Sequence, residues 1–296
     1  MLLKEKVHSF INHPYPLWEC NLTALLVQEK WTELGINRQI NPDNYSTVAC
    51  IYDDANDKIP PIKNQPILSF DGENGAVYLE NPSFDYLQKF YDEHGLAPLS
   101  ENELTSSHAG AKIKSAFNTI DQVPVANACI KRLVRSIHVL SQEDAEIDVS
   151  YSHPVIPFSI FVSVCQDSSM LSNLRVAESM LHEAMHLKLT LIEEITPMVK
   201  SNTVGLYFSP WREEKRPAQG VLHGLFVFSA IHDFYLQMLA KFSDIKDVNS
   251  YLNFRIEDIE KELKRLDDFP NTSDLTPEGK MLATKLLLNL NPLNNQ

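Results

Sequence analysis

Apolar side chains recur at three- and four-residue spacing along most of the chain, which is the pattern of amphipathic helices. Stretches of this kind span residues 22–34, 84–94, 100–120, 125–140, 172–187, 218–242, 248–267 and 277–290. Gly95 follows the second stretch as a stop signal, and Ser100 with Glu103 has the form of a capping box that opens the third. The sequence therefore predicts a protein built mainly from helices.

The middle of the chain carries a different pattern. Residues 147–151 and 159–164 alternate with period two and are rich in β-branched and aromatic side chains, which predicts two strands. The segment at residues 41–81 is rich in Pro, Asn and Asp and predicts loops with short strands, such as one at residues 76–79. We therefore expect a mainly α protein of the α+β class, with a small sheet next to the helix at 172–187.

The domain organisation follows from length and from this change of pattern. A chain of 296 residues suits one large domain or two closely packed ones. We expect an N-terminal, mostly helical region at residues 1–140, which could pack as part of one domain, and a catalytic region at residues 141–296.

Charge and composition narrow the class of partner and the compartment. The formal net charge is -13, which argues against nucleic acid or an anionic membrane surface as the main partner. No apolar run is long enough to span a bilayer, and the first residues lack an apolar signal core, so we expect a cytoplasmic protein. The scattered Cys20, Cys50, Cys129 and Cys165 are then expected to be reduced thiols rather than disulfides.

The strongest chemical signal is an HExxH motif in the predicted helix at 172–187. His182 and His186 are four residues apart, so both imidazoles project from one helix face and can bind one divalent metal. Glu183 lies about a quarter-turn away. The alternative is a chance match on an ordinary amphipathic helix; the surrounding helix formers favour a metal site.

Two histidines alone do not hold a catalytic metal tightly, so a third protein ligand is expected downstream. Our candidate is His223, although a lone histidine on an apolar helix is often a core residue. Gly220 and Gly224 flank it, and such small residues would let its helix approach the HExxH helix closely. His232, about two and a half turns later, falls on the opposite face and is left out.

Charged residues just before the His223 helix offer further chemistry. Glu213 and Glu214 are rival ligands, and either would give the two-histidine, one-glutamate set of a zinc peptidase. Arg212 and Arg216 could form a local anion site, because a guanidinium group matches a carboxylate bidentately. The alternative is a surface network among these four side chains.

Taken together, these motifs resemble a known family. The matching segments are residues 159–164, 181–186, 209–212, 216–217 and 222–224. They are similar to the HExxH-motif proteins of modified-peptide biosynthesis, which are regarded as 2-oxoglutarate-dependent, iron-containing peptide β-hydroxylases on a zincin-like core. The resemblance covers about residues 150–240, and residues 1–140 carry nothing that matches.

The resemblance implies an Fe(II) site with His182, His186 and His223 as ligands. It implies that Arg216, with Arg212 second, binds a carboxylate of 2-oxoglutarate, and that O2 and a precursor peptide are the other substrates. Glu183 would then be an outer-shell partner or proton relay. The set lacks the carboxylate ligand of the usual two-histidine, one-carboxylate triad. The strand at 159–164 could pair with an extended peptide at the sheet edge.

Two other functions remain open from the residues. In a zinc-dependent HExxH peptidase, Glu183 would be the general base acting on metal-bound water. In a non-catalytic peptide-binding protein, the metal would be structural, and an intact Glu183 would not be needed. The arginines and the all-histidine ligand set favour the oxygenase.

Overall fold

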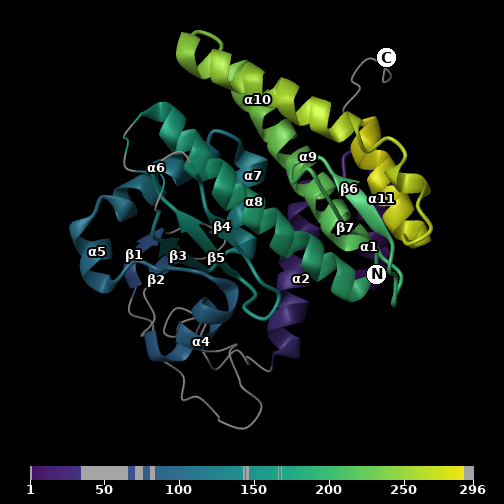
Figure 1. Ribbon diagram of the computed structural model, residues 1–296, viewed down its shortest axis with the longest axis horizontal. Helices are drawn as coiled ribbons and strands as arrows, with labels where there is room; N and C mark the ends of the chain where they lie inside the picture. Colours follow the sequence, from purple (N-terminus) through teal and green to yellow (C-terminus); the bar gives the residue numbers. More distant parts are fainter. Residues whose placement is uncertain are drawn as a thin grey trace. The chain divides into compact units, whose positions relative to one another are not determined.

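The computed structural model describes residues 2–34, 66–70, 76–80, 84–142, 144, 147–165, 167 and 169–289 (Figure 1). The helices are α1 (Leu3–Asn12), α2 (Cys20–Glu33), α4 (Phe84–His94), α5 (Glu101–Ser106), α6 (Ala109–Ile120), α7 (Pro124–Leu133), α8 (Met170–Ile195), α9 (Ala218–Lys241), α10 (Lys246–Lys264), the 3-10 helix η1 (Phe269–Asn271) and α11 (Pro277–Leu288). The strands are β1 (Pro66–Phe70), β2 (Val77–Glu80), β3 (Ser136–Leu140), β4 (Ser150–Tyr151), β5 (Ser159–Ser163), β6 (Leu206–Ser209) and β7 (Glu214–Pro217). The predicted mainly α, α+β class is confirmed.

The chain divides into two compact units, and we describe each by itself. The first contains residues 1–26 and 188–296, and the second contains residues 27–187. The predicted boundary near residue 140 falls inside the second unit, and the predicted region 141–296 includes parts of both units.

The second unit contains a five-stranded sheet in the order β1-β2-β3-β5-β4. Strands β2, β3 and β5 run parallel, whereas β1 and β4 are antiparallel to their neighbours. The suggestion that the strand at 159–164 could pair with an extended peptide at the sheet edge is wrong, because β5 is hydrogen-bonded to β3 on one side and β4 on the other. All five β5 side chains are buried, as expected for an interior strand.

Two predicted helices in this unit end earlier than their periodicity suggested. The capping box at Ser100 and Glu103 is confirmed, but α5 stops at Ser106 and α6 begins at Ala109. The Ser107 hydroxyl oxygen accepts a hydrogen bond from the Ala109 N–H, with 3.2 Å between oxygen and nitrogen. This bond satisfies one of the N–H groups at the start of α6 that have no partner within the helix. The helix predicted at 125–140 is wrong in its second half, where β3 pairs with β2 and β5 and is fully buried.

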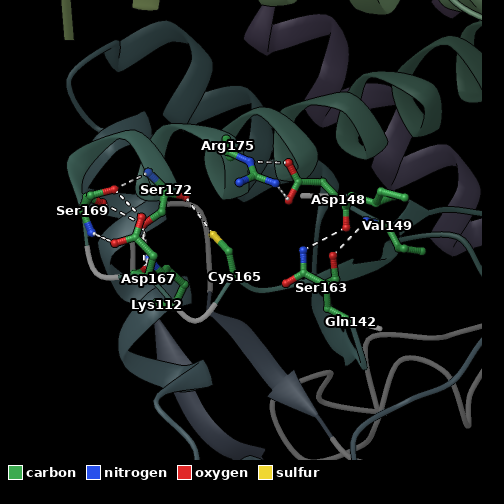
Figure 2. Close-up of polar contacts among 11 residues, drawn as sticks. Lys112, Gln142, Asp148, Val149, Ser163, Cys165, Asp167, Ser169, Ser172 and Arg175 are labelled. Atoms are coloured by element: carbon green, nitrogen blue, oxygen red, sulfur yellow. Dashed lines mark hydrogen bonds and ion pairs between the residues drawn. The ribbon is translucent and has the colours of Figure 1, made fainter. Parts of the chain in front are cut away.

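A buried lysine fixes where α8 begins. Lys112 of α6 is 3% exposed, and its ammonium group donates to the Asp167 carbonyl and, at 2.5 Å, to the Ser172 hydroxyl (Figure 2). The Ser169 hydroxyl donates to the Asp167 carboxylate at 2.5 Å. That bond lowers the pKa of the exposed Asp167 carboxyl. Together these bonds hold the turn from which α8 starts.

A second contact ties α8 to the chain that leads into β4. The Arg175 guanidinium donates to both Asp148 carboxylate oxygens, at 2.8 and 3.0 Å (Figure 2). One residue later, Val149 exchanges hydrogen bonds with Ser163 of β5. The segment that carries Ser150 and Ser152 is therefore held between the sheet and α8.

Because a histidine is buried in β3, we expect the free energy of unfolding to fall at acid pH. His138 is 1% exposed, neither ring nitrogen has a hydrogen-bond partner among the described residues, and burial lowers its pKa to about 3. The unfolded chain binds a proton there below pH of about 6.5, whereas the folded chain does not, so folding stability falls as pH drops. Between pH 7 and pH 5 we expect this residue to cost about 2 kcal/mol. Chemical denaturation of wild type and His138→Leu at both pH values checks this, and equal losses in the two proteins would contradict it.

In the first unit, the N-terminal residues pack on C-terminal helices. Trp18 donates its indole N–H to the Asp233 carboxylate of α9 at 2.5 Å, and the buried Lys188 donates to the Leu17 carbonyl at 2.6 Å. Residues 206–217 form the β6–β7 hairpin before α9. Of its eight strand residues only Ser209 is buried, so the strands show little hydrophobic periodicity.

The long helices α8, α9, α10 and α11 confirm the corresponding predictions. No disulfide links Cys20, Cys129 and Cys165, as expected, while Cys50 lies outside the described residues. None of the described helices combines the length and the apolar character needed to cross a bilayer.

Candidate metal site

The HExxH histidines meet on the second unit's part of α8. Their Nε2 atoms are 3.1 Å apart, and their ring planes are inclined by 64°. Two nitrogens that occupy adjacent octahedral positions about 2.1 Å from one metal ion lie about 3 Å apart, so the observed spacing fits a shared cation. The same spacing also suits a hydrogen bond between two neutral rings, one donating and one accepting. Both rings are half-buried, which leaves each partly accessible.

Glu183 of the motif is bound to the sheet. Glu183 is 4% exposed. Its two carboxylate oxygens accept hydrogen bonds from the Ser150 and Ser152 hydroxyls, each at 2.6 Å. Ser150 lies in the edge strand β4 and Ser152 follows its last residue, so the two side chains, two residues apart, share one face. The sequence prediction missed both serines. The predicted strand at 147–151 includes Ser150 but not Ser152, and nothing in the sequence pointed to Glu183 as their partner.

Tyr151 lies between the two serines and joins a different group. Its hydroxyl is 2.9 Å from the Nδ1 atom of His94 in α4, and the rings of His94 and His153 have centroids 4.8 Å apart. Partial burial raises the pKa of Tyr151, and the nearby Glu183 charge adds to the effect. The pKa of His153 is lowered by burial and then by His94. The Tyr151 phenol therefore stays protonated at neutral pH.

The predicted third ligand, His223, belongs to the first unit. Its Nε2 atom is 2.9 Å from a carboxylate oxygen of Glu193, and both side chains are nearly buried, at 12% and 13% exposure. Sequence reasoning missed Glu193, which follows His186 by seven residues in α8. The prediction that His223 joins His182 and His186 on one metal stays a prediction.

The glycines around His223 lie beside residues of their own unit. A Cβ atom at Gly224 would lie 1.9 Å from Cζ2 of Trp211, in the β6–β7 turn. The prediction that these glycines admit the HExxH helix stays a prediction. Trp211 also packs on Phe228, with ring centroids 5.1 Å apart. At Gly220 a Cβ atom would be 3.5 Å from Nε of Arg216, an ordinary contact. Gly224 is thus required by an indole ring of the same unit.

The charged hairpin lies at the surface. Glu213 accepts from Arg265 at 2.6 Å, and this bond lowers the pKa of the Glu213 carboxyl. Glu214 is 3.9 Å from Nε of Arg216, and Arg212 is exposed. The rival ligands Glu213 and Glu214 therefore each lie beside a guanidinium group. The prediction that Arg216 and Arg212 bind a carboxylate of 2-oxoglutarate stays a prediction.

Across the part of the chain that the structure describes, no three His, Cys, Asp or Glu side chains form a group that could hold a metal ion. The structure brings His182 and His186 together as a pair. It brings His223 to Glu193.

Comparison with known proteins identifies no family: no family model matches the chain, and no curated protein matches its sequence. The resemblance to HExxH-motif peptide hydroxylases therefore stays a prediction.

Proposed function

We propose that the protein is an Fe(II)- and 2-oxoglutarate-dependent oxygenase that hydroxylates a side-chain carbon of a ribosomally made peptide. The observation that supports a metal-dependent enzyme is the 3.1 Å spacing between the Nε2 atoms of His182 and His186. Two imidazoles from one helical turn are a suitable donor pair for iron.

The surroundings of Glu183 favour an oxygenase over a zinc peptidase. A peptidase needs this carboxylate as a base directed at metal-bound water. Here each carboxylate oxygen already accepts a serine hydroxyl at 2.6 Å, and the residue is buried. Such a carboxylate holds the helix against β4, and through it the orientation of His182. We therefore assign Glu183 a positioning role.

In this proposal His182 and His186 hold the metal, with His223 as the predicted third ligand and with Arg216 and Arg212 as the predicted partners of the co-substrate carboxylate. Iron at such a site supplies activation of O2 together with a chelating 2-oxo acid. The overall reaction takes one oxygen atom of O2 into the peptide hydroxyl and the other into succinate, with loss of CO2. The three thiols Cys20, Cys129 and Cys165 are compatible with a reducing cytoplasm as its location.

The test combines the purified protein, Fe(II), 2-oxoglutarate and O2 with a peptide encoded beside its gene. We expect the peptide mass to rise by one oxygen atom, with one succinate formed per oxygen inserted. The His182→Ala variant is the control and should leave the peptide unchanged. Cleavage of that peptide or of casein by the zinc-loaded protein, without oxygen insertion, would favour the peptidase. Peptide binding without any mass change under either condition would favour a non-catalytic binding protein.

A further inference from the structure

An open pocket of 440 Å³ lies in the first unit, beside the His223–Glu193 contact. It is formed by the end of α8, the segment after it and the start of α9. Its lining includes Glu193, Pro197, Met198, Asn202, Pro217 and Gln219. No part of the pocket depends on the HExxH histidines.

The pocket contains a nearly buried carboxylate with one oxygen still available. Oε2 of Glu193 accepts from Nε2 of Gln219 at 3.1 Å and lies 2.9 Å from Nε2 of His223. Within the described residues, no donor bonds to Oε1. The side chain is 13% exposed, so most of its surface is shielded from water. A carboxylate oxygen in such a setting favours a charged donor from a ligand.

The charge and the walls of the pocket indicate the chemical class of its ligand. Among the lining residues Lys200 alone carries a positive charge, and its ammonium group donates to the Ser273 carbonyl at 2.6 Å. Pro197, Met198 and Pro217 give part of the pocket apolar walls. A cation with an apolar stem would satisfy both the acceptor and these walls.

Because only Oε1 of Glu193 is available, the pocket favours an ammonium group over a guanidinium group. A guanidinium group binds a carboxylate best through two parallel hydrogen bonds, which need both oxygens. An ammonium group is a compact charge with three donors, and one carboxylate oxygen with neighbouring amide and hydroxyl acceptors can satisfy it. Gln219, Asn202 and Thr203 supply such acceptors around Glu193.

We propose that this pocket binds a primary ammonium group carried on an apolar stem, as found on a lysine side chain or a free alkylamine. The site goes beyond the proposed oxygenase function and needs no metal. Glu193 supplies the charge, and Gln219 holds its second oxygen in place.

The test measures binding to the full chain by calorimetry at pH 8, where histidine side chains are generally neutral. The probes are n-butylammonium and Nα-acetyl-lysine amide, with Nα,Nε-diacetyl-lysine amide as the neutral analogue. We expect the ammonium probes to bind and the neutral analogue to bind at least about tenfold more weakly, because it lacks the charge-assisted hydrogen bond. This comparison uses wild-type protein, so it does not depend on the folding of a variant.

Two variants with the same charge change provide the matched control. Glu193→Gln should weaken ammonium binding at least about tenfold, whereas Glu194→Gln should leave it unchanged, since Glu194 is exposed and outside the pocket lining. Equal weakening by both variants, or equal affinity for the neutral analogue, would overturn the proposal, as would no binding of either ammonium probe. Tighter binding of the lysine amide would identify a peptide lysine as the source. Equal binding of both probes would identify a free amine.

Discussion

Replacing His182 or His186 with alanine is expected to lower the affinity for Fe(II) by more than about 100-fold. Removal of an outer-shell partner typically costs about 10- to 100-fold in metal affinity, and loss of a direct ligand should exceed this. The physical reason is the 3.1 Å spacing of the two Nε2 atoms, which one cation can bridge only if both rings are present. Anaerobic competition with a coloured chelator measures the affinity.

Two matched variants make this result specific. Glu183→Gln keeps both histidines and should retain metal within the smaller range expected for an outer-shell partner. His13→Ala removes an exposed histidine of the first unit and should change nothing. Equal affinity of wild type and His182→Ala would contradict the proposed site, and a loss in Glu183→Gln as large as that in His182→Ala would contradict the positioning role of Glu183.

The same titration decides the role of His223. If His223 is the third ligand, His223→Ala should lower the affinity as strongly as His182→Ala. If its function is the contact with Glu193 in the first unit, His223→Ala should leave the metal affinity unchanged. It should instead change the binding of ammonium probes in the 440 Å³ pocket. The first outcome confirms the prediction from sequence, and the second shows it to be wrong.

Replacing Gly224 with alanine is expected to destabilise the protein by about 2 kcal/mol or more, because overpacking a rigid contact displaces its neighbours. The new methyl group would lie 1.9 Å from Cζ2 and 2.2 Å from Cε2 of Trp211. The indole ring cannot move freely, since it also packs on Phe228. Denaturant unfolding, with the same slope in both proteins, measures the difference.

Gly220→Ala is the matched control in the same helix. Its Cβ atom would be 3.5 Å from Arg216, which is an ordinary contact. Alanine also favours a helix over glycine by up to about 1 kcal/mol, so this variant should be as stable as wild type or more so. If Gly224→Ala were equally well tolerated, the packing of Trp211 on α9 would be wrong.

The elements that the sequence predicts well are the long amphipathic helices. Helices α9 to α11 lie close to their predicted ranges, and α8 contains its predicted range but continues to Ile195. Strand β3 was missed, since Ile137, Val139 and Leu140 continue the apolar pattern of α7 and only pairing with β2 and β5 distinguishes the strand. The β6–β7 hairpin was missed because its strands are short and largely exposed.

The site divides in the same way. Helical geometry predicts the His182–His186 pair, because four residues nearly complete one turn. The hydroxyls of Ser150 and Ser152 reach Glu183 only through the placement of β4 beside α8, and that placement depends on contacts such as Arg175 with Asp148. Glu193 escaped notice for the same reason, since its partner His223 is 30 residues away.

The most direct measurement is the visible absorption of the protein under anaerobic conditions with Fe(II) and 2-oxoglutarate. Chelation of iron by the 2-oxo acid on a protein site should produce a weak charge-transfer band. We expect this band in wild type and not in the His182→Ala/His186→Ala double variant. A wild-type protein that gives no band, while binding zinc tightly through the same histidines, would contradict the oxygenase account.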